Sequence, residues 1–144
     1  MNIGFYLLPK SEVKFLNPES TIRQALEKMS YHKYTSVPLV DEDGKYSGTL
    51  TEGDLLWKLK DDLDEEENYE EVIQRTKLRD VPRRVQNIPI SINANMEDLI
   101  TLATDQNFIP ITDDNGHFIG IIRRRDIIKY CASVIWDRNN TNSK

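Results

Sequence analysis

The sequence predicts an α+β fold in which a strand–helix–strand–strand–helix unit occurs twice. Short apolar runs alternate with stretches whose apolar residues recur at helical spacing. The second half of the chain also repeats the first, at an offset of 74 residues in the first helix and of 72 from the strand prolines onward, as Gly48–Asp54 and Gly120–Asp126 illustrate. These two observations together predict two copies of one small unit.

Length, charge and cysteine content narrow the class of protein. The 144 residues suffice for one compact domain or two small lobes, and the formal net charge is −5. Such a charge does not favour non-specific binding to nucleic acid or to an anionic membrane. The one cysteine, Cys131, excludes an intrachain disulfide and a multi-cysteine zinc site. No run approaches the roughly 18 apolar residues of a membrane span, so we expect a cytoplasmic protein without a metal site.

The first repeat is expected over residues 13–60, after an N-terminal segment of residues 1–12. In that segment Phe5–Leu8 predicts a short strand or a turn. Asn17-Pro18 should end the first strand, and Ser20 or Thr21 should cap the first helix. The elements expected after the N-terminal segment are a strand at Val13–Leu16, a helix with the stripe Ile22, Ala25, Leu26 and Met29, strands at Ser36–Val40 and Tyr46–Leu50, and a second helix through Leu59.

The turn at Gly48–Asp54 is the most informative stretch. Thr51 and Asp54 have the spacing of a capping box, with a hydroxyl at the N-cap and a carboxylate three residues later. A strand that leads into a helix N-terminus presents free backbone N–H groups and the positive end of the helix dipole. Such a turn suits the ribose and phosphates of a nucleotide.

An acidic linker is expected over residues 61–76, rich in Asp and Glu and exposed to solvent. Val72, Ile73 and Leu78 should anchor a short helix that returns the chain to the core. The second repeat is expected over residues 77–136, with a first strand at Ile88–Ile92 and Asn95 capping the next helix. A polar tail over residues 137–144 should fray.

The order of these motifs resembles a pair of CBS domains of the stand-alone bacterial type. The matching features are the apolar helix stripe, the strand ending in hydrophobic-Pro, the Asp-rich Gly turn, and Gly-hydrophobic-hydrophobic-Thr-x-x-Asp. They occur in two copies over about 120 of the 144 residues. The resemblance implies a pseudo-twofold pair with short mixed sheets, a homodimer shaped as a disc, and adenosine-containing ligands in the clefts between the repeats.

The resemblance also implies site residues. In the first repeat, Asp54 and Thr51 would contact the ribose, with the base near the segment Tyr34, Thr35, Ser36, Val37 and Pro38. In the second repeat, Asp126 would take the same role, beside Asn107, Phe108, Ile109 and Pro110.

The second copy departs from the family pattern because Arg123 stands where the threonine is expected. Arg124 and Arg125 follow it, so three cations surround a helix N-terminus, which is unfavourable unless anions accompany them. Arginine binds phosphate with up to two hydrogen bonds at once. Tyr34–Pro38 and Arg124-Arg125 are also similar to segments of cyclic di-AMP receptors. AMP, ADP, ATP and cyclic di-AMP are therefore the expected ligands, as regulators and not as catalytic cofactors.

We predict a regulatory adenine-nucleotide sensor that signals to a partner protein and is not an enzyme, since no nucleophile–base set or Walker sequence is present. The main alternative is a ligand-free CBS module for dimerisation or protein interaction. A nucleic-acid binder would use Arg83, Arg84 and Arg123–Arg125, against the net charge. A hydrolase hidden in the same cleft is the last alternative.

Overall fold

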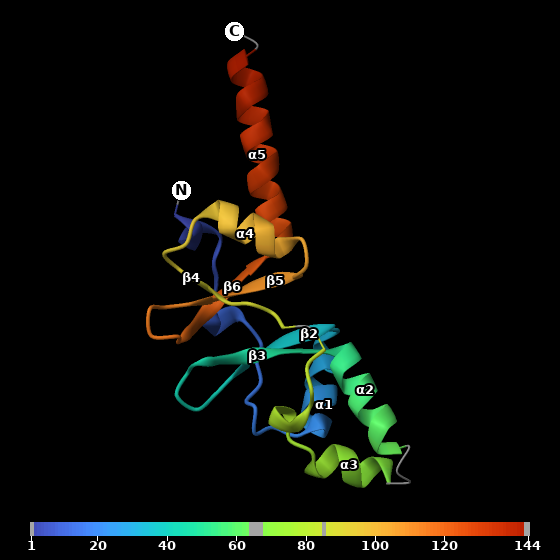
Figure 1. Cartoon of the computed structure of the whole chain (residues 1–144). Helices are drawn as coiled ribbons and strands as arrows, with labels where there is room; N and C mark the ends of the chain where they lie inside the picture. The colour runs from blue at the N-terminus through green and yellow to red at the C-terminus, as the bar shows by residue number, and fades with distance from the viewer. Residues whose placement is uncertain (1, 64–67, 85, 143–144) are drawn as a thin grey trace. The chain divides into compact units, whose positions relative to one another are not determined.

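The structure, a computed structural model, describes residues 2–63, 68–84 and 86–142. Contacts between Cα atoms divide the chain into two compact units, one of Lys14–Asn87 and one of Met1–Val13 with Ile88–Lys144. Each unit contains one copy of the predicted repeat, built from helices and short strands (Figure 1). The predicted α+β class with two repeats is therefore confirmed.

The unit Lys14–Asn87 contains the first repeat. Thr21 caps its first helix in a capping box with Gln24: the Gln24 N–H donates to Thr21 Oγ1 at 3.3 Å, and the Thr21 N–H donates to Gln24 Oε1 at 2.9 Å. The helix ends at Lys33, whose φ of 58° is left-handed. The elements are α1 (Ile22–His32), β2 (Ser36–Val40), β3 (Tyr46–Thr51), α2 (Glu52–Leu63), α3 (Tyr69–Arg75) and the short 3-10 helix η3 (Leu78–Asp80).

The strands β2 and β3 form an antiparallel hairpin, and Leu16 adds a parallel bridge beside Leu39. The Leu16 N–H donates to Pro38 O at 3.0 Å and its carbonyl accepts the Val40 N–H at 2.8 Å. The predicted strand at Val13–Leu16 was too long, because only Leu16 pairs. Upstream, Lys10–Glu12 form the 3-10 helix η2, and the Val13 N–H bonds back to Lys10 O at 3.1 Å.

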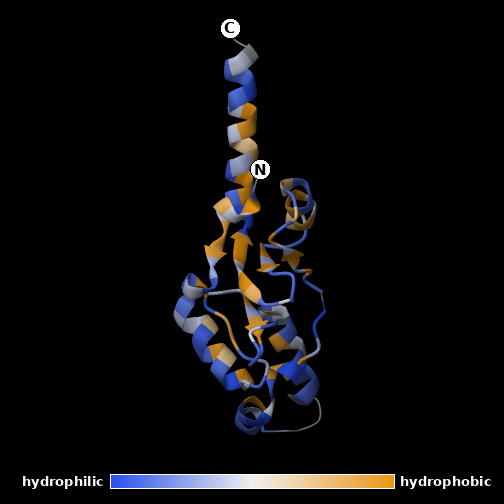
Figure 2. Cartoon of the chain, turned by 90° about the vertical axis from the view of Figure 1, so that its left-hand side faces the viewer, coloured by the Kyte–Doolittle hydropathy of each residue, from blue (hydrophilic) through white to orange (hydrophobic). Residues whose placement is uncertain are grey.

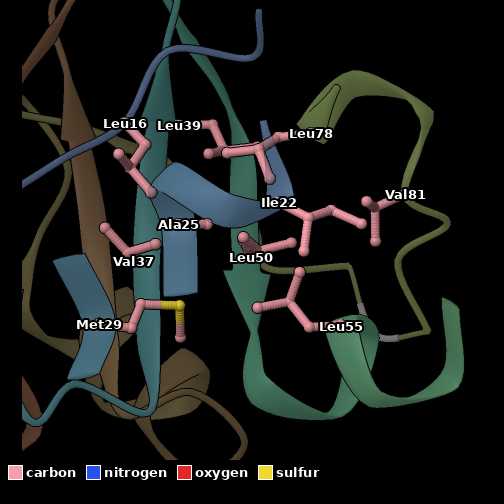
Figure 3. Close-up of a cluster of buried hydrophobic side chains, with 10 residues drawn as sticks. All are labelled: Leu16, Ile22, Ala25, Met29, Val37, Leu39, Leu50, Leu55, Leu78 and Val81. Carbon is pink, nitrogen blue, oxygen red and sulfur yellow. The ribbon is translucent and has the colours of Figure 1, made fainter. Parts of the chain in front are cut away.

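The core of this unit lies between α1, the hairpin and α2 (Figure 3). Val37, Leu39 and Leu50 are fully buried on the inner face of the hairpin. Helix α1 turns its predicted stripe to them, with Ile22, Ala25 and Met29 buried and Leu26 partly buried. The cluster is completed by Leu16, Leu55, Leu78 and Val81.

The acidic stretch continues α2 as far as Leu63, and its residues 64–67 lie outside the described part of the chain. Beyond them, Asn68 caps α3, whose Val72 is buried. Leu78 then returns to the core as predicted, and its N–H donates to Ser20 O at 2.8 Å. Helix formation thus extends into both ends of the stretch expected to be a linker.

The other unit contains the second repeat and the N-terminal segment. Its sheet has the order β1-β6-β5-β4, with β4 parallel to β5 and the other pairs antiparallel, so it is mixed as expected. The predicted strand Ile88–Ile92 is reduced to two residues; Pro89 has no N–H to donate. Its elements are η1 (Ile3–Tyr6), β1 (Leu8–Pro9), β4 (Ile90–Ser91), α4 (Met96–Ala103), β5 (Phe108–Thr112), β6 (Phe118–Arg123) and α5 (Arg124–Asn142).

Helix α5 runs through most of the stretch predicted to be a frayed tail. Figure 2 shows hydrophilic and hydrophobic segments alternating along it. Ile135 and Trp136 are exposed, at 60% and 67%. In the described residues, no helix is both long and apolar enough to span a membrane.

Candidate functional site

The turn between β3 and α2 is closed by a reciprocal pair of hydrogen bonds. The Asp54 N–H donates to Thr51 Oγ1 at 3.1 Å, and the Thr51 N–H donates to Asp54 Oδ2 at 3.0 Å. This is the capping box predicted from the spacing of the two residues. It fixes the carboxylate at the first turn of α2, where the helix dipole favours negative charge.

The second oxygen of Asp54 is held by a segment distant in the sequence. The Arg84 N–H donates to Asp54 Oδ1 at 3.0 Å, and Asp54 is only 2% exposed. The carboxylate is therefore buried and bonded on both oxygens. Each oxygen has a further acceptor position, which a ribose hydroxyl could use if it reached the site.

The segment Tyr34–Pro38 lies along the same turn. Strand β2 places Ser36 opposite Thr51, and Thr35 O accepts the Glu52 N–H at 3.0 Å. The Tyr34 ring is 36% exposed and stacks on His32, with ring centroids 5.3 Å apart. Tyr34, Thr35 and Ser36 thus stand beside the Thr51–Asp54 pair.

Val37 and Pro38 are buried. The Val37 side chain packs in the core cluster of this unit. For this residue a contact with a base would have to come from the main chain.

The turn between β6 and α5 keeps the aspartate but replaces its partner. Arg123 Nε donates to Asp126 Oδ2 at 2.8 Å, and Asp126 is 9% exposed. A donor thus stands where Thr51 supplies an acceptor in the first repeat. The Arg124 N–H donates to Asn107 O at 3.0 Å, which is the counterpart of the bond between Glu52 and Thr35.

The three consecutive arginines meet three different surroundings. Arg123 pairs with Asp126, and Arg124 Nε donates to the carbonyl of Ala103 at 2.8 Å. Ala103 is the last residue of α4, so this bond places a cation at the negative end of a helix dipole. Arg125 is exposed. Near this turn Asn107 is exposed and Phe108 is partly buried, while Ile109 and Pro110 are buried.

A groove of about 730 Å³ lies between α1 and α2. Of the predicted site residues only Tyr34 lines it, together with Leu26, Met29, Ser30, Lys33, Glu52, Gly53, Leu55, Leu56 and Leu59. In the other unit, a groove of about 600 Å³ is lined by residues between Ile88 and Leu102 and includes none of the predicted site residues. No cluster of His, Cys, Asp and Glu suited to a metal ion occurs in residues 2–63, 68–84 and 86–142.

The contribution of the segment after Pro82 was not predicted in detail. The sequence marked Arg83 and Arg84 only as basic residues, yet the Arg84 main chain binds Asp54 and its guanidinium lies 4.0 Å above the Trp57 ring. The contact joins residues 30 positions apart, so no local motif signals it. A basic pair after a proline was the one available sign.

Tyr46 also belongs to this neighbourhood. Its hydroxyl lies 2.7 Å from Thr49 Oγ1 and donates to Asn87 O at 3.3 Å. Burial raises the pKa of the Tyr46 phenol, while the Thr49 hydrogen bond and the positive charge of Arg83 act in the opposite direction. The phenol therefore stays protonated at neutral pH.

Comparison with known proteins agrees with the repeat. The chain is 23% identical to the CBS domain-containing protein CBSX1 of Arabidopsis thaliana, over 92% of this chain and 64% of that protein. The chain thus spans less than two thirds of that relative.

Solved structures resemble it as well. CbpB in complex with c-di-AMP matches with a TM-score of 0.82 at 21% identity, covering 98% of this chain and 91% of that one. CBSX2 in complex with AMP matches with a TM-score of 0.71 at 21% identity, covering 92% and 97%. The sequence model of the CBS domain matches residues 7–61 and 78–133, which is most of the chain, so this protein belongs to the CBS domain family.

Proposed function

We propose that this chain is a cytoplasmic, non-catalytic regulatory protein that binds an adenine nucleotide reversibly at its strand-to-helix turns. The observation that carries the proposal is the Asp54 carboxylate, fixed at the first turn of α2 by the amides of Thr51 and Arg84. A fixed, partly unsaturated acceptor suits the paired hydroxyls of a ribose. Two solved CBS-pair structures were determined with c-di-AMP and with AMP.

In this proposal the first repeat is the stronger nucleotide site. Asp54 accepts the ribose hydroxyls and Thr51 assists. The half-exposed Tyr34 ring and the adjacent Thr35 lie next to the base. The ligand is AMP, ADP, ATP or cyclic di-AMP.

The second site would favour phosphate over ribose. The Arg123–Asp126 ion pair occupies one oxygen of the aspartate, and Arg125 is exposed beside it. Arg124 Nε donates to the Ala103 carbonyl. Its terminal amines have no hydrogen-bond partner within residues 2–63, 68–84 and 86–142, so they can donate to an anion. The two sites should therefore differ in affinity.

The regulatory output would be a change in the affinity for a partner protein, driven by different nucleotide affinities of two states of this protein.

Homodimer formation is part of the same proposal. Leu56 on α2 and Ile128 on α5 occupy equivalent positions in the two repeats, and both are exposed, at 67% and 60%. Exposed apolar side chains at matching positions support self-association. Light scattering after gel filtration measures the mass that decides this part.

A second function is favoured by a specific observation. Both aspartates already accept hydrogen bonds from the chain itself, Asp54 from Thr51 and Arg84, and Asp126 from Arg123. In a ligand-free interaction module, the hydrogen bonds of these buried carboxylates would have to come from the chain itself in this way.

Calorimetric titration with AMP, ADP, ATP and cyclic di-AMP separates the two functions. The sensor predicts at least one dissociation constant below about 1 mM, roughly −4 kcal/mol. Asp54→Asn should weaken that binding, whereas Asp43→Asn, an exposed residue in the same unit, should not. Failure of all four ligands leaves the interaction module.

A further inference from the structure

The guanidinium of Arg83 packs directly onto the backbone of Gly48. A Cβ built on Gly48 would lie 2.8 Å from Arg83 Cζ and 2.9 Å from Nη1, so a side chain at residue 48 would displace the arginine. Gly48 also has φ of 125°, which disfavours other residues. The Arg83 guanidinium therefore has a defined position against β3 at Gly48, which lies three residues before the N-cap residue Thr51.

Among the described residues, this cation has no compensating group. Arg83 Nε is buried and meets no hydrogen-bond acceptor in the described part of the chain. Within the same residues no carboxylate lies within 4.0 Å of its guanidinium, whereas Arg79 pairs with Glu19 at 2.8 Å and Arg123 with Asp126. A buried donor without an acceptor is unfavourable. Such a group is expected where an external anion completes it.

The second repeat shows that the backbone at this glycine position can be packed against without a charged group. Gly120 is the counterpart of Gly48, and there the chain of β1 lies against the glycine, with Pro9 opposite Gly120 in the register. Uncharged atoms, the Leu8 backbone and the Leu7 side chain, fill the space in one repeat, and a guanidinium fills it in the other. Space filling alone thus does not account for Arg83.

The neighbouring residue fixes where this cation stands. Arg84 donates its N–H to Asp54, and its side chain lies over the Trp57 ring at 4.0 Å. Arg83 therefore directly precedes the residue whose amide binds the carboxylate proposed to hold the ribose. We propose that the terminal amines of Arg83 bind a phosphoryl group of the nucleotide in the first repeat, an assignment that rests on the proposed function. The planar guanidinium can give a phosphate two parallel hydrogen bonds.

The test compares a nucleotide, its nucleoside and an anion without a base. Calorimetry measures AMP, adenosine and inorganic pyrophosphate against the wild-type chain, Arg83→Gln and Arg79→Gln. Arg79 is a matched control because it is an exposed arginine of the same unit. Loss of a charge-assisted contact should weaken AMP by about tenfold or more and change adenosine less than about twofold. Arg79→Gln should change neither ligand. Arg83→Lys, which keeps the charge without the fork, should fall between.

Equal weakening of AMP and adenosine by Arg83→Gln, or no weakening of AMP, overturns the assignment. So does wild-type protein that binds AMP no better than adenosine. If wild-type protein binds no adenine ligand, the proposed function fails. Pyrophosphate binding that is lost in Arg83→Gln would then still support an anion site, and its absence would overturn that site too. Melting curves of both variants at Arg83 show whether the fold is retained.

Discussion

Asp54→Ala is expected to destabilise the fold strongly as well as to impair binding. The substitution leaves the N–H groups of Thr51 and Arg84 without their acceptor, at a residue that is 2% exposed. Hydrogen bonds to a charged group contribute about 1.5–3 kcal/mol each. Two of them give a loss of about 3–6 kcal/mol in the free energy of unfolding, or a melting temperature lower by roughly 10–20 °C.

The second repeat supplies the matched control for this experiment. The Asp126 side chain accepts one hydrogen bond among the described residues, from Arg123, whose side chain is 34% exposed and can turn to water. Asp126→Ala should therefore cost about 1 kcal/mol. Urea unfolding followed by circular dichroism gives both values. Equal losses in the two variants, or a loss below about 1 kcal/mol for Asp54→Ala, would refute the role given to the Arg84 amide.

Two further predictions concern groups near the turns. Tyr46→Phe removes a phenol, and burial raises the pKa of that phenol. The neutral phenol therefore stabilises the fold fully at a pH below its usual pKa of about 10, and this stabilisation is lost as the pH rises further. The stability gap between wild type and Tyr46→Phe should stay constant below a pH of about 10 and narrow as the pH rises above that value, and a gap that widens contradicts the assignment. Arg124→Ala should lower the free energy of unfolding by about 1–2 kcal/mol, because the Ala103 carbonyl loses its donor. The loss for Arg125→Ala, at an exposed residue, should be less than about 0.5 kcal/mol. Urea unfolding measures both values, and the reverse order would contradict this assignment.

Much of the fold could be predicted from the sequence because its signals are local and doubled. The capping boxes at Thr21, Thr51 and Asn95 depend on residues three apart, and the apolar stripe of α1 follows from helical spacing. The lengths of the strand at Val13–Leu16 and of the last helix were harder to predict from the sequence. The first depends on how much of a segment finds a partner strand, and the second on polar residues that form a helix without a core to cover.

The partners of the site residues were the least predictable part. A threonine-to-arginine change at residue 123 indicated only a lost hydroxyl, whereas the structure pairs the arginine with Asp126. The second ligand of Asp54 is a main-chain amide from the segment after Pro82. A main-chain donor carries no residue type, so no sequence pattern identifies it.

The central claim is that an adenine nucleotide binds at the turn between β3 and α2. Amide chemical shifts of the isotope-labelled chain, recorded during separate titrations with AMP, ADP, ATP and cyclic di-AMP, test it most directly. The largest changes should fall on the amides of Thr51, Asp54 and Arg84, which surround the carboxylate. No shifts at several millimolar AMP, ADP, ATP and cyclic di-AMP, each titrated separately, or shifts confined to the groove between Ile88 and Leu102, would contradict the claim.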